Sequence, residues 1–335
     1  MNTGTPMNTF AWLVKREYWE NRGGFLWTPA IVAMVFLSIM LIVLISAEFI
    51  ARKNGVDING IQLEQLTRHL GPEEMAKMQA GMDIGLLTLG VPIGIALFFV
   101  VFFYGIGALY NDRADRSALF WKSLPISDTG TVLSKVAAAI VLAPVLATFA
   151  LIALQLGFLI LMSLYALLHG INPFPLLWSP THLVAMWVKL FLMLPVNALW
   201  ALPCIGWLLL CSSFARSKPF LWAVMLPIFA GVLNSWIGLM DHVSSLSNTW
   251  FWRHVVGRLL LSIFPGSWLD AEELREGFQE AGGMHVGVNG ISPTLTFEAI
   301  GHALTTPDML IGIVAGAAMI AGAIYFRRQR TESYA

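Results

Sequence analysis

Long apolar runs dominate this chain and limit its fold more than any other feature. Hydrophobic residues make up 57% of the 335 positions and charged residues only 12%, against about 25% charged residues in an ordinary soluble domain. Zero net charge gives no reason to expect nucleic-acid binding. The sequence therefore predicts an all-α polytopic membrane protein, a single transmembrane domain over 1–335. The six runs that can each cross about 30 Å of hydrocarbon are Trp27–Ala47, Ile84–Leu109, Val132–Leu168, Leu183–Cys211, Pro219–Met240 and Asp308–Phe326.

The third run, Val132–Leu168, is longer than a bilayer requires, about 55 Å as one helix. Two spans of about 17 residues would just fit it, but no Gly/Pro/Asn turn cluster divides it. We expect one long helix that projects from the membrane, with a kink at Pro144, where proline removes a backbone donor.

Lysine and arginine are unevenly divided between the connecting segments. Clusters of Lys and Arg occur in the segments on one side of the predicted membrane, at 15–22, 113–122, 216–218 and 327–330. The 169–181 connection, on the other side, has no Lys or Arg. Short loops rich in Lys and Arg face the cytoplasm. Both termini and the 110–128 loop are therefore expected in the cytoplasm, and the larger helical loops 48–83 and 241–307 on the outer side.

Aromatic and charged residues alternate before the first span, in 8–24. Such a mixture is typical of a helix that lies in the headgroup layer, although a cytoplasmic extension of the first span would have the same composition. The residues that predict the interfacial helix are Trp12, Lys15, Arg16, Tyr18 and Trp19.

The loop after the second span, 110–128, is more charged and more aromatic than a simple connection needs. Asp112 and Arg116 have the i,i+4 spacing of a helical ion pair, and Leu119-Phe120-Trp121 supplies the aromatic anchors that dominate interfaces. This pattern favours a docking surface for a soluble partner; the alternative is a solvated loop with its aromatics in the headgroups. The candidate docking residues are Asn111, Asp112, Arg113, Asp115, Arg116, Leu119, Phe120, Trp121 and Lys122.

Four polar residues within the spans are candidates for lining a pathway: Gln155, Lys189, Asn197 and Asn234. A lysine inside a span is costly and marks function by default, but Lys189 lies near a helix end, where its stem can snorkel to the headgroups. The three amides can instead hydrogen-bond between helices, and that is the favoured interpretation.

The sequence contains no motif typical of nucleotide binding, metal binding or catalysis. The dipeptide Gly-Lys of a phosphate-binding loop does not occur, nor does HExxH or Cys-x-x-Cys. Cys204 and Cys211 lie about 10.5 Å apart on one helix, too far for a disulfide. Ser267 would need a general base to act as a nucleophile and is better explained as a helix cap. We expect no catalytic residue, no metal site and no cofactor in this chain.

Three segments, WLVKREYWENRGGFLW at Trp12–Trp27, LYNDRADRSALFWKSLP at Leu109–Pro125 and SSFARSKPFLW at Ser212–Trp222, together with the six spans, resemble an ABC-2 type ABC transporter permease of bacterial exporters. The resemblance covers nearly the whole chain, and Leu109–Pro125 is its most specific part.

The resemblance implies a bacterial inner-membrane exporter with two permease subunits, here a homodimer, and two copies of a separate ATPase that bind ATP and Mg. Coupling would pass through Asn111–Lys122 and the N-terminal helix, and the first and fifth spans would form the dimer seam. The outer loops are bulkier than in compact members of the family, so no substrate is carried over. The alternative function is a membrane anchor or sensor that recruits a cytoplasmic partner without moving a solute.

Overall fold

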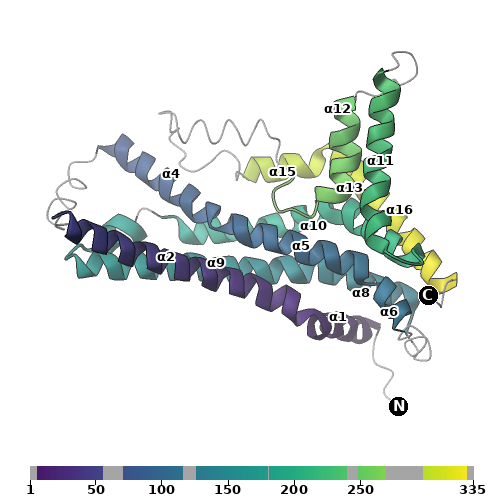
Figure 1. Ribbon diagram of the computed structural model, residues 1–335, viewed down its shortest axis with the longest axis horizontal. Coiled ribbons are helices and arrows are strands. Elements are labelled where there is room, and N and C mark those ends of the chain that lie inside the picture. The colour runs from purple at the N-terminus through teal and green to yellow at the C-terminus, as the bar shows by residue number, and fades with distance from the viewer. Residues whose placement is uncertain are drawn as a thin grey trace.

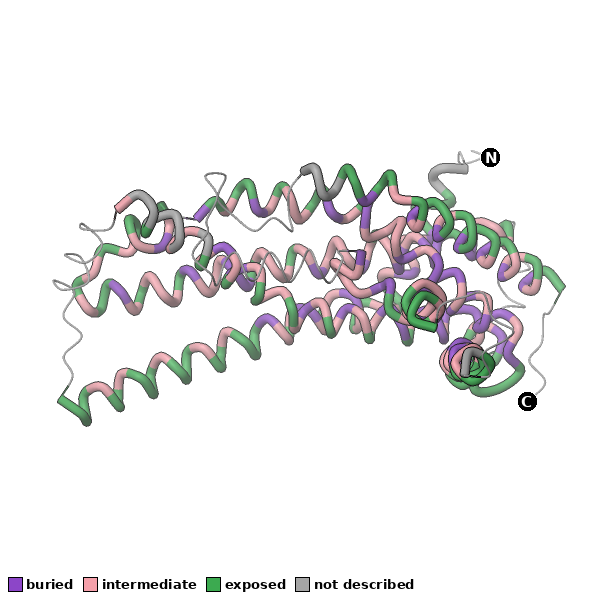
Figure 2. Tube along the Cα trace, turned by 90° about the horizontal axis from the view of Figure 1, so that it is seen from above, coloured by how far each residue is buried: buried purple, intermediate pink, exposed green. Residues whose placement is uncertain are grey.

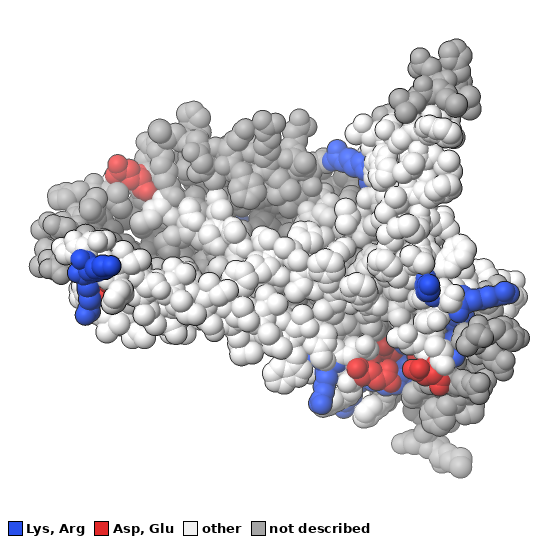
Figure 3. All heavy atoms as spheres, in the orientation of Figure 1, with Lys and Arg blue, Asp and Glu red and all other residues white. Residues whose placement is uncertain are grey.

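The computed structural model describes residues 6–55, 71–115, 126–179, 181–239, 248–268 and 297–329, and within these ranges every element is helical (Figure 1). Six helices are long and apolar enough to cross a membrane. The predicted all-α polytopic membrane fold with six spans is confirmed. On the face drawn in Figure 3, charged side chains gather toward the two ends of the helix bundle, and the surface between them over α2 and α5 carries no charge.

The first span is the middle of a longer helical run. Helix α1 (Pro6–Arg22) leads through a π-helical turn, η1 (Gly23–Trp27), into α2 (Thr28–Lys53). The backbone breaks from helical geometry at Asn21, with φ −113° and ψ 18°. The helical run is therefore continuous but bent at Asn21, within the 8–24 segment and before the first span. Helix α2 also continues past the predicted end of the span at Ala47.

The second span is built from α4 (Pro72–Thr88) and α5 (Gly90–Gly107), followed by the short α6 (Tyr110–Ala114). Glu74 fixes the start of α4, because its Oε2 accepts a hydrogen bond of 3.0 Å from the Gly71 N–H. Proline at the first helical position needs no such partner. Helix α4 thus covers the last third of the predicted 48–83 loop and continues into the second candidate span, Gly81–Ala114.

The third span is one helical run from Asp128 to Leu168. Helix α8 (Asp128–Ala137) begins at Ser127, whose Oγ accepts from the Gly130 N–H, and continues through η2 (Ala138–Leu142) into α9 (Ala143–Leu168). The π-helical turn lies directly before Pro144. A π turn is one of the local distortions that accommodate a residue without a backbone N–H inside a long helix.

Helices α10 (Leu183–Phe214), preceded by η3 (Phe174–Trp178), and α16 (Pro307–Gln329) form the closest helix pair. Glycines permit the approach: a Cβ added at Gly206 would lie 2.7 Å from the carbonyl oxygen of Gly316, and one added at Gly316 would lie 2.7 Å from the carbonyl carbon of Leu202. Small residues have this role in many membrane helix pairs. Thr306 caps the start of α16, since its Oγ1 accepts from the Met309 N–H at 3.4 Å.

The remaining elements are α11 (Pro219–Leu239), α12 (Asn248–Phe251), η4 (Trp252–Gly257), α13 (Arg258–Leu261) and α15 (Phe297–Thr305). The run from α12 to α13 lies within the predicted outer loop 241–307, which was expected to be helical. In Figure 1, α11 and α12 lie side by side and rise steeply from the other helices.

The other long helices run alongside one another and enclose the core. Helices α2, α5, α9 and α10 share contacts, and the buried residues of α5, α9 and α10 include Leu97, Val101, Leu154, Ile205 and Leu208. Figure 2 shows buried residues gathered among the helices and long exposed stretches on the outer ones. The N- and C-termini lie toward the same end of the bundle, beside α1, α6 and the start of α8 (Figure 1). This terminal end carries most of the charged residues described next.

Candidate functional site

A chain of buried ion pairs joins four helices at the terminal end of the bundle. Lys135 Nζ lies 3.1 Å from Glu17 Oε1 and 3.5 Å from Asp112 Oδ2. Asp112 Oδ2 in turn lies 3.2 Å from Arg327 Nη1, and Arg327 Nε lies 3.1 Å from Asp128 Oδ1. These five residues, with Arg16 at 2.6 Å from Glu17 Oε1, form what we call the ion cluster. It contains three cations and three carboxylates, so its formal charge is zero.

Local packing explains why these charges are buried. Leu13 and Glu17 lie one turn apart on the face of α1 that packs on α8, and Lys135 lies between Val132 and Val136 on the buried face of α8. Glu17 is fully buried and Lys135 is 3% exposed. A buried charge is tolerated only when it is paired and hydrogen-bonded.

The carboxylate of Glu17 has a further partner in α5. The Tyr104 hydroxyl donates to Glu17 Oε2 at 2.8 Å, and the Tyr104 ring packs edge-on against Phe25 with centroids 5.0 Å apart. The ion cluster thus connects α1, α6, α8 and α16 directly, and α5 through Tyr104.

Arg113 binds the base of the charged loop to α10. Its Nη2 donates to the carbonyl oxygens of Ser212 at 2.6 Å and Ala215 at 3.0 Å, which lie at the C-terminal end of α10. Ser212 Oγ accepts from the backbone N–H groups of Leu109 and Tyr110. Arg113 is buried, so its predicted place in an exposed docking surface is wrong: the residue caps a helix end instead.

The rest of the predicted docking surface is divided. Asn111 and Asp115 are exposed on and beside α6, whereas Asp112 points into the ion cluster and pairs with Lys135 and Arg327. The remaining candidates, Arg116, Leu119, Phe120, Trp121 and Lys122, lie outside the described residues, and so does the predicted pair between Asp112 and Arg116.

Three of the five predicted interfacial residues of α1, Trp12, Lys15 and Trp19, lie on its exposed face. Trp12 and Trp19 are exposed, and Tyr18 is half-buried. Lys15 Nζ lies 4.6 Å from the centre of the Trp12 ring. Arg16 turns toward Glu17 and Glu20 instead. Exposed indoles beside cations suit the boundary between headgroups and water.

Of the four candidate pathway residues, Gln155 forms hydrogen bonds to two neighbouring helices. It is fully buried, its Nε2 donates to the Leu86 carbonyl oxygen at 3.1 Å, and its Oε1 accepts from Trp187 Nε1 at 2.9 Å. Gln155 therefore links α9 to α4 and α10. Lys189 is half-buried on α10, within electrostatic range of the buried Asp83 of α4.

Asn197 and Asn234 have different surroundings. Asn197 Oδ1 accepts from Trp268 Nε1 at 2.8 Å and from the Gly266 N–H at 3.3 Å. Asn234 of α11 is half-buried, and its Nδ2 has no hydrogen-bond partner among the described residues. Of these two amides, Asn197 lines the cavity described next.

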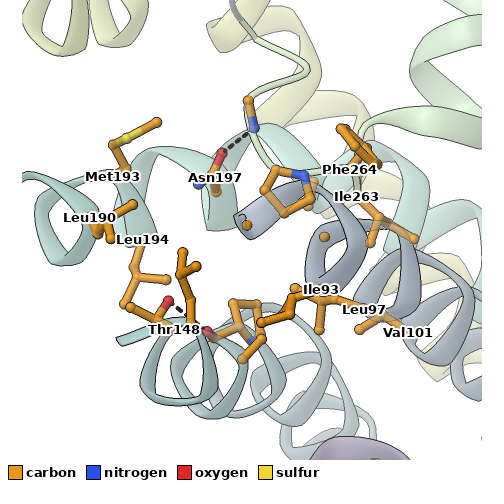
Figure 4. Close-up of a pocket in the computed structure, with 18 of the residues that line it drawn as sticks. Ile93, Leu97, Val101, Thr148, Leu190, Met193, Leu194, Asn197, Ile263 and Phe264 are labelled. Atoms are coloured by element: carbon orange, nitrogen blue, oxygen red, sulfur yellow. Dashed lines mark hydrogen bonds between the residues drawn. The ribbon is translucent and has the colours of Figure 1, made fainter. Parts of the chain in front are cut away.

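That cavity has a volume of about 320 Å³ and lies between α4–α5, η2–α9 and α10. The segment 263–266 covers it, and Figure 4 shows Asn197 bonded to this roof above a space bordered by Ile93, Leu97 and Leu194. Gly266 has φ +81°, a backbone conformation that favours glycine. Of the predicted pathway residues, Asn197 lines this cavity, whereas Gln155, Lys189 and Asn234 do not.

Another buried cation, Arg258, lies near the start of α16. Arg258 stacks on Trp200 at 3.5 Å from the ring centre, and Gly312 leaves the space that its guanidinium fills. Nε and Nη2 of Arg258 have no hydrogen-bond partner among the described residues. Burial lowers the pKa of Arg258 to about 10, and Asp308 opposes this shift, so the group remains charged at neutral pH.

Within the described part of the chain, no group of His, Cys, Asp and Glu has the arrangement of a metal site. His169 and His254 each lie within 3.4 Å of a single carboxylate, Glu48 and Asp308 respectively. Cys204 and Cys211 are buried free thiols, as expected. The Ser267 hydroxyl donates to the Ser262 carbonyl oxygen, and no described histidine hydrogen-bonds to it.

Sequence reasoning missed the ion cluster because its members lie in four separate helices, α1, α6, α8 and α16. One signal was present: Lys135 lies in a mostly apolar helix, and an ionisable residue in such a helix implies a buried partner. Glu17 gave no such signal, because α1 also contains Lys15, Arg16 and Glu20.

No protein-family model matches the chain, and no curated protein and no solved structure matches it either. The function must be inferred from the residues and geometry of the chain itself.

Proposed function

We propose that this chain is the membrane-spanning subunit of an ATP-driven exporter in a bacterial inner membrane, an ABC-2 type permease with both termini in the cytoplasm. In this proposal a separate ATPase, which binds ATP and Mg, docks on the loop after the second span. The exposed Asn111 and Asp115 would belong to the docking surface, and two copies of the chain would pair with two ATPase subunits.

The observation that carries most weight is the place of Asp112 in the ion cluster. Asp112 belongs to the first turn of α6, where the charged loop begins, and it shares its carboxylate between Lys135 of α8 and Arg327 of α16. Lys135 extends the contact to Glu17 of α1. A partner that displaces the loop would therefore act at once on three other helices. Buried, well-packed charge networks transmit such displacements because they have few alternative arrangements.

The exposed apolar helices support pairing of two copies. Among the six candidate spans, those that contain α2 and α11 have the smallest share of buried residues in their most apolar stretch. Their outward faces carry large side chains, for example Ile42 and Phe229, exposed by 61% and 63%. Lipid would cover these faces equally well, so pairing is tested by the oligomeric state of the purified chain.

The orientation is tested with single cysteines placed at the two ends. In a chain whose Cys204 and Cys211 are replaced by alanine, Asp115→Cys is expected to be labelled by an impermeant maleimide only after the cytoplasmic side is opened. Asn54→Cys, at the other end, should be labelled in intact cells. The reverse pattern would overturn the topology and the coupling proposal with it.

Docking is tested by copurification and transport. Trp121→Ala combined with Arg116→Glu should lower the recovery of a candidate ATPase that copurifies with the wild-type chain and abolish ATP-dependent export. Arg52→Glu is the control, because Arg52 is 79% exposed at the opposite end. Equal ATPase recovery and export in both variants would refute the docking surface. Intact docking with no ATP-dependent solute movement in wild-type vesicles would favour the anchor or sensor function.

A further inference from the structure

We propose that the cavity beneath the 263–266 roof binds one hydrocarbon chain of a phospholipid from the surrounding bilayer. The inference concerns the isolated permease chain and does not depend on transport.

The cavity is long in the direction of the helices. Its wall extends from Ile84 to Val101 along α4–α5 and from Leu190 to Ile205 along α10, distances of about 25 Å and 22 Å at the helical rise. Because its volume is only about 320 Å³, a cavity of that length has a narrow cross-section. This shape suits one unbranched chain better than a compact ring system.

The wall of the cavity is apolar and uncharged. None of the residues that line the cavity is ionisable, and only three carry a polar side chain: Thr88, Thr148 and Asn197. The two threonine hydroxyls donate to the carbonyl oxygens of Ile84 and Pro144, at 2.8 and 2.9 Å. Asn197 Oδ1 already accepts two hydrogen bonds from the roof. Apolar cavities of this kind exclude water and bind apolar ligands.

The cavity opens toward the region that lipid would occupy. Thr88 and Val91 line the cavity and are also exposed at the molecular surface, Val91 by 49%. Both lie within the second candidate span, Gly81–Ala114. An acyl chain can therefore enter sideways from the bilayer, and its charged headgroup stays outside because nothing in the wall would pair with it.

A matched pair of glycine substitutions tests the proposal. A Cβ at Gly94 would lie 3.8 Å from Pro265 Cδ and 3.9 Å from Phe264 Cζ, beneath the roof, so Gly94→Leu extends a side chain into the cavity. Gly85 is in the same helical run but outside the cavity wall, and a Cβ there meets nothing within 4 Å. Gly85→Leu is therefore the control for helix propensity and added bulk.

The purified chain is placed in nanodiscs of phosphatidylethanolamine and phosphatidylglycerol that contain a phospholipid with a diazirine in one acyl chain. Wild-type protein and Gly85→Leu should be crosslinked on the inward residues of 87–97 and 190–197. Labelling of these residues in Gly94→Leu should be about tenfold weaker, which corresponds to a loss of about 1.4 kcal/mol in binding free energy. Crosslinks confined to outward residues such as Ile95 and Phe99, or an equal loss in both variants, would overturn the proposal.

Thr148→Phe fills the cavity from the opposite wall and keeps the test decisive if Gly94→Leu fails to fold. A long-chain alcohol should compete with the photolabel, whereas glycerophosphocholine should not. Competition by the headgroup alone would refute recognition of the hydrocarbon chain.

Discussion

Lys135 and Glu17 are 118 residues apart in the sequence, yet their side chains form a buried ion pair, with 3.1 Å between Nζ and Oε1. This pair holds the N-terminal helix against the start of the third span. It lies at the centre of the ion cluster, so its removal tests whether the cluster stabilises the terminal end of the bundle.

We expect Lys135→Met to lower the free energy of unfolding by about 3–5 kcal/mol, because it removes the cation that Glu17 and Asp112 share and leaves each carboxylate with a single cation, Arg16 or Arg327. Combining it with Glu17→Gln should recover part of that loss. Thermal unfolding in detergent measures both variants. The control is Arg52→Ala, which removes an exposed pair with Glu48 and should cost about 0–1 kcal/mol. Equal losses from the two pairs would contradict a structural role for the cluster.

Arg113→Ala should loosen the C-terminal end of α10. Net contributions of hydrogen bonds from a charged donor are about 1.5–3 kcal/mol, and Arg113 donates to the carbonyl oxygens of Ser212 and Ala215. The buried thiol of Cys211 lies in this last turn, so its reaction with a small maleimide should accelerate. Cys204, two turns deeper, is the internal control. If both thiols stay equally protected, Arg113 is not the cap of this helix.

Alanine at Gly316 should weaken the packing of α10 against α16. The added Cβ would lie 2.7 Å from the carbonyl carbon and 2.8 Å from the carbonyl oxygen of Leu202, and backbone cannot move aside as a side chain can. Overpacking of this kind costs about 1–3 kcal/mol, measured as a lower Tm. Gly81→Ala, where the Cβ meets nothing within 4 Å, should leave Tm unchanged or slightly higher.

Asn197→Leu should release the roof of the cavity. The variant leaves the Gly266 N–H and the Trp268 indole N–H without their acceptor, so hydrogen exchange at Gly266 should accelerate by about tenfold or more. Asn234→Leu makes the same chemical change at an amide whose Nδ2 has no described partner and should leave the roof unaffected. Similar exchange in both variants would show that Asn197 does not hold the segment.

Arg258→Met should preserve or raise Tm. Nε and Nη2 of Arg258 are buried without a hydrogen-bond partner among the described residues, and apolar residues of similar volume often match or exceed the stability of buried charges. Trp200→Ala, which removes the ring beneath the guanidinium, should lower Tm instead. A marked loss of Tm in Arg258→Met would mean that stacking on Trp200 outweighs the cost of burying the charge.

Much of the fold follows from local sequence. Runs of about 20 apolar residues determine the number of spans, because a bilayer provides no other partner for the backbone. The continuity of 128–168 follows from the lack of a turn signal, and the separation of Cys204 and Cys211 along one helix rules out a disulfide. The sequence also predicted correctly that Gln155 would bond between helices, as its bonds to Leu86 and Trp187 show.

Tertiary structure alone decided which charges are buried together. The sequence marks Asp112 and Arg113 as one charged patch, yet Asp112 turns to Arg327, 215 residues away, and Arg113 to the end of α10. The shape of the cavity and the place of Asn197 in it likewise depend on how α5, α9 and α10 pack. Hydropathy acts residue by residue along the chain, whereas ion pairing and cavity shape depend on distances between helices, which no local pattern encodes.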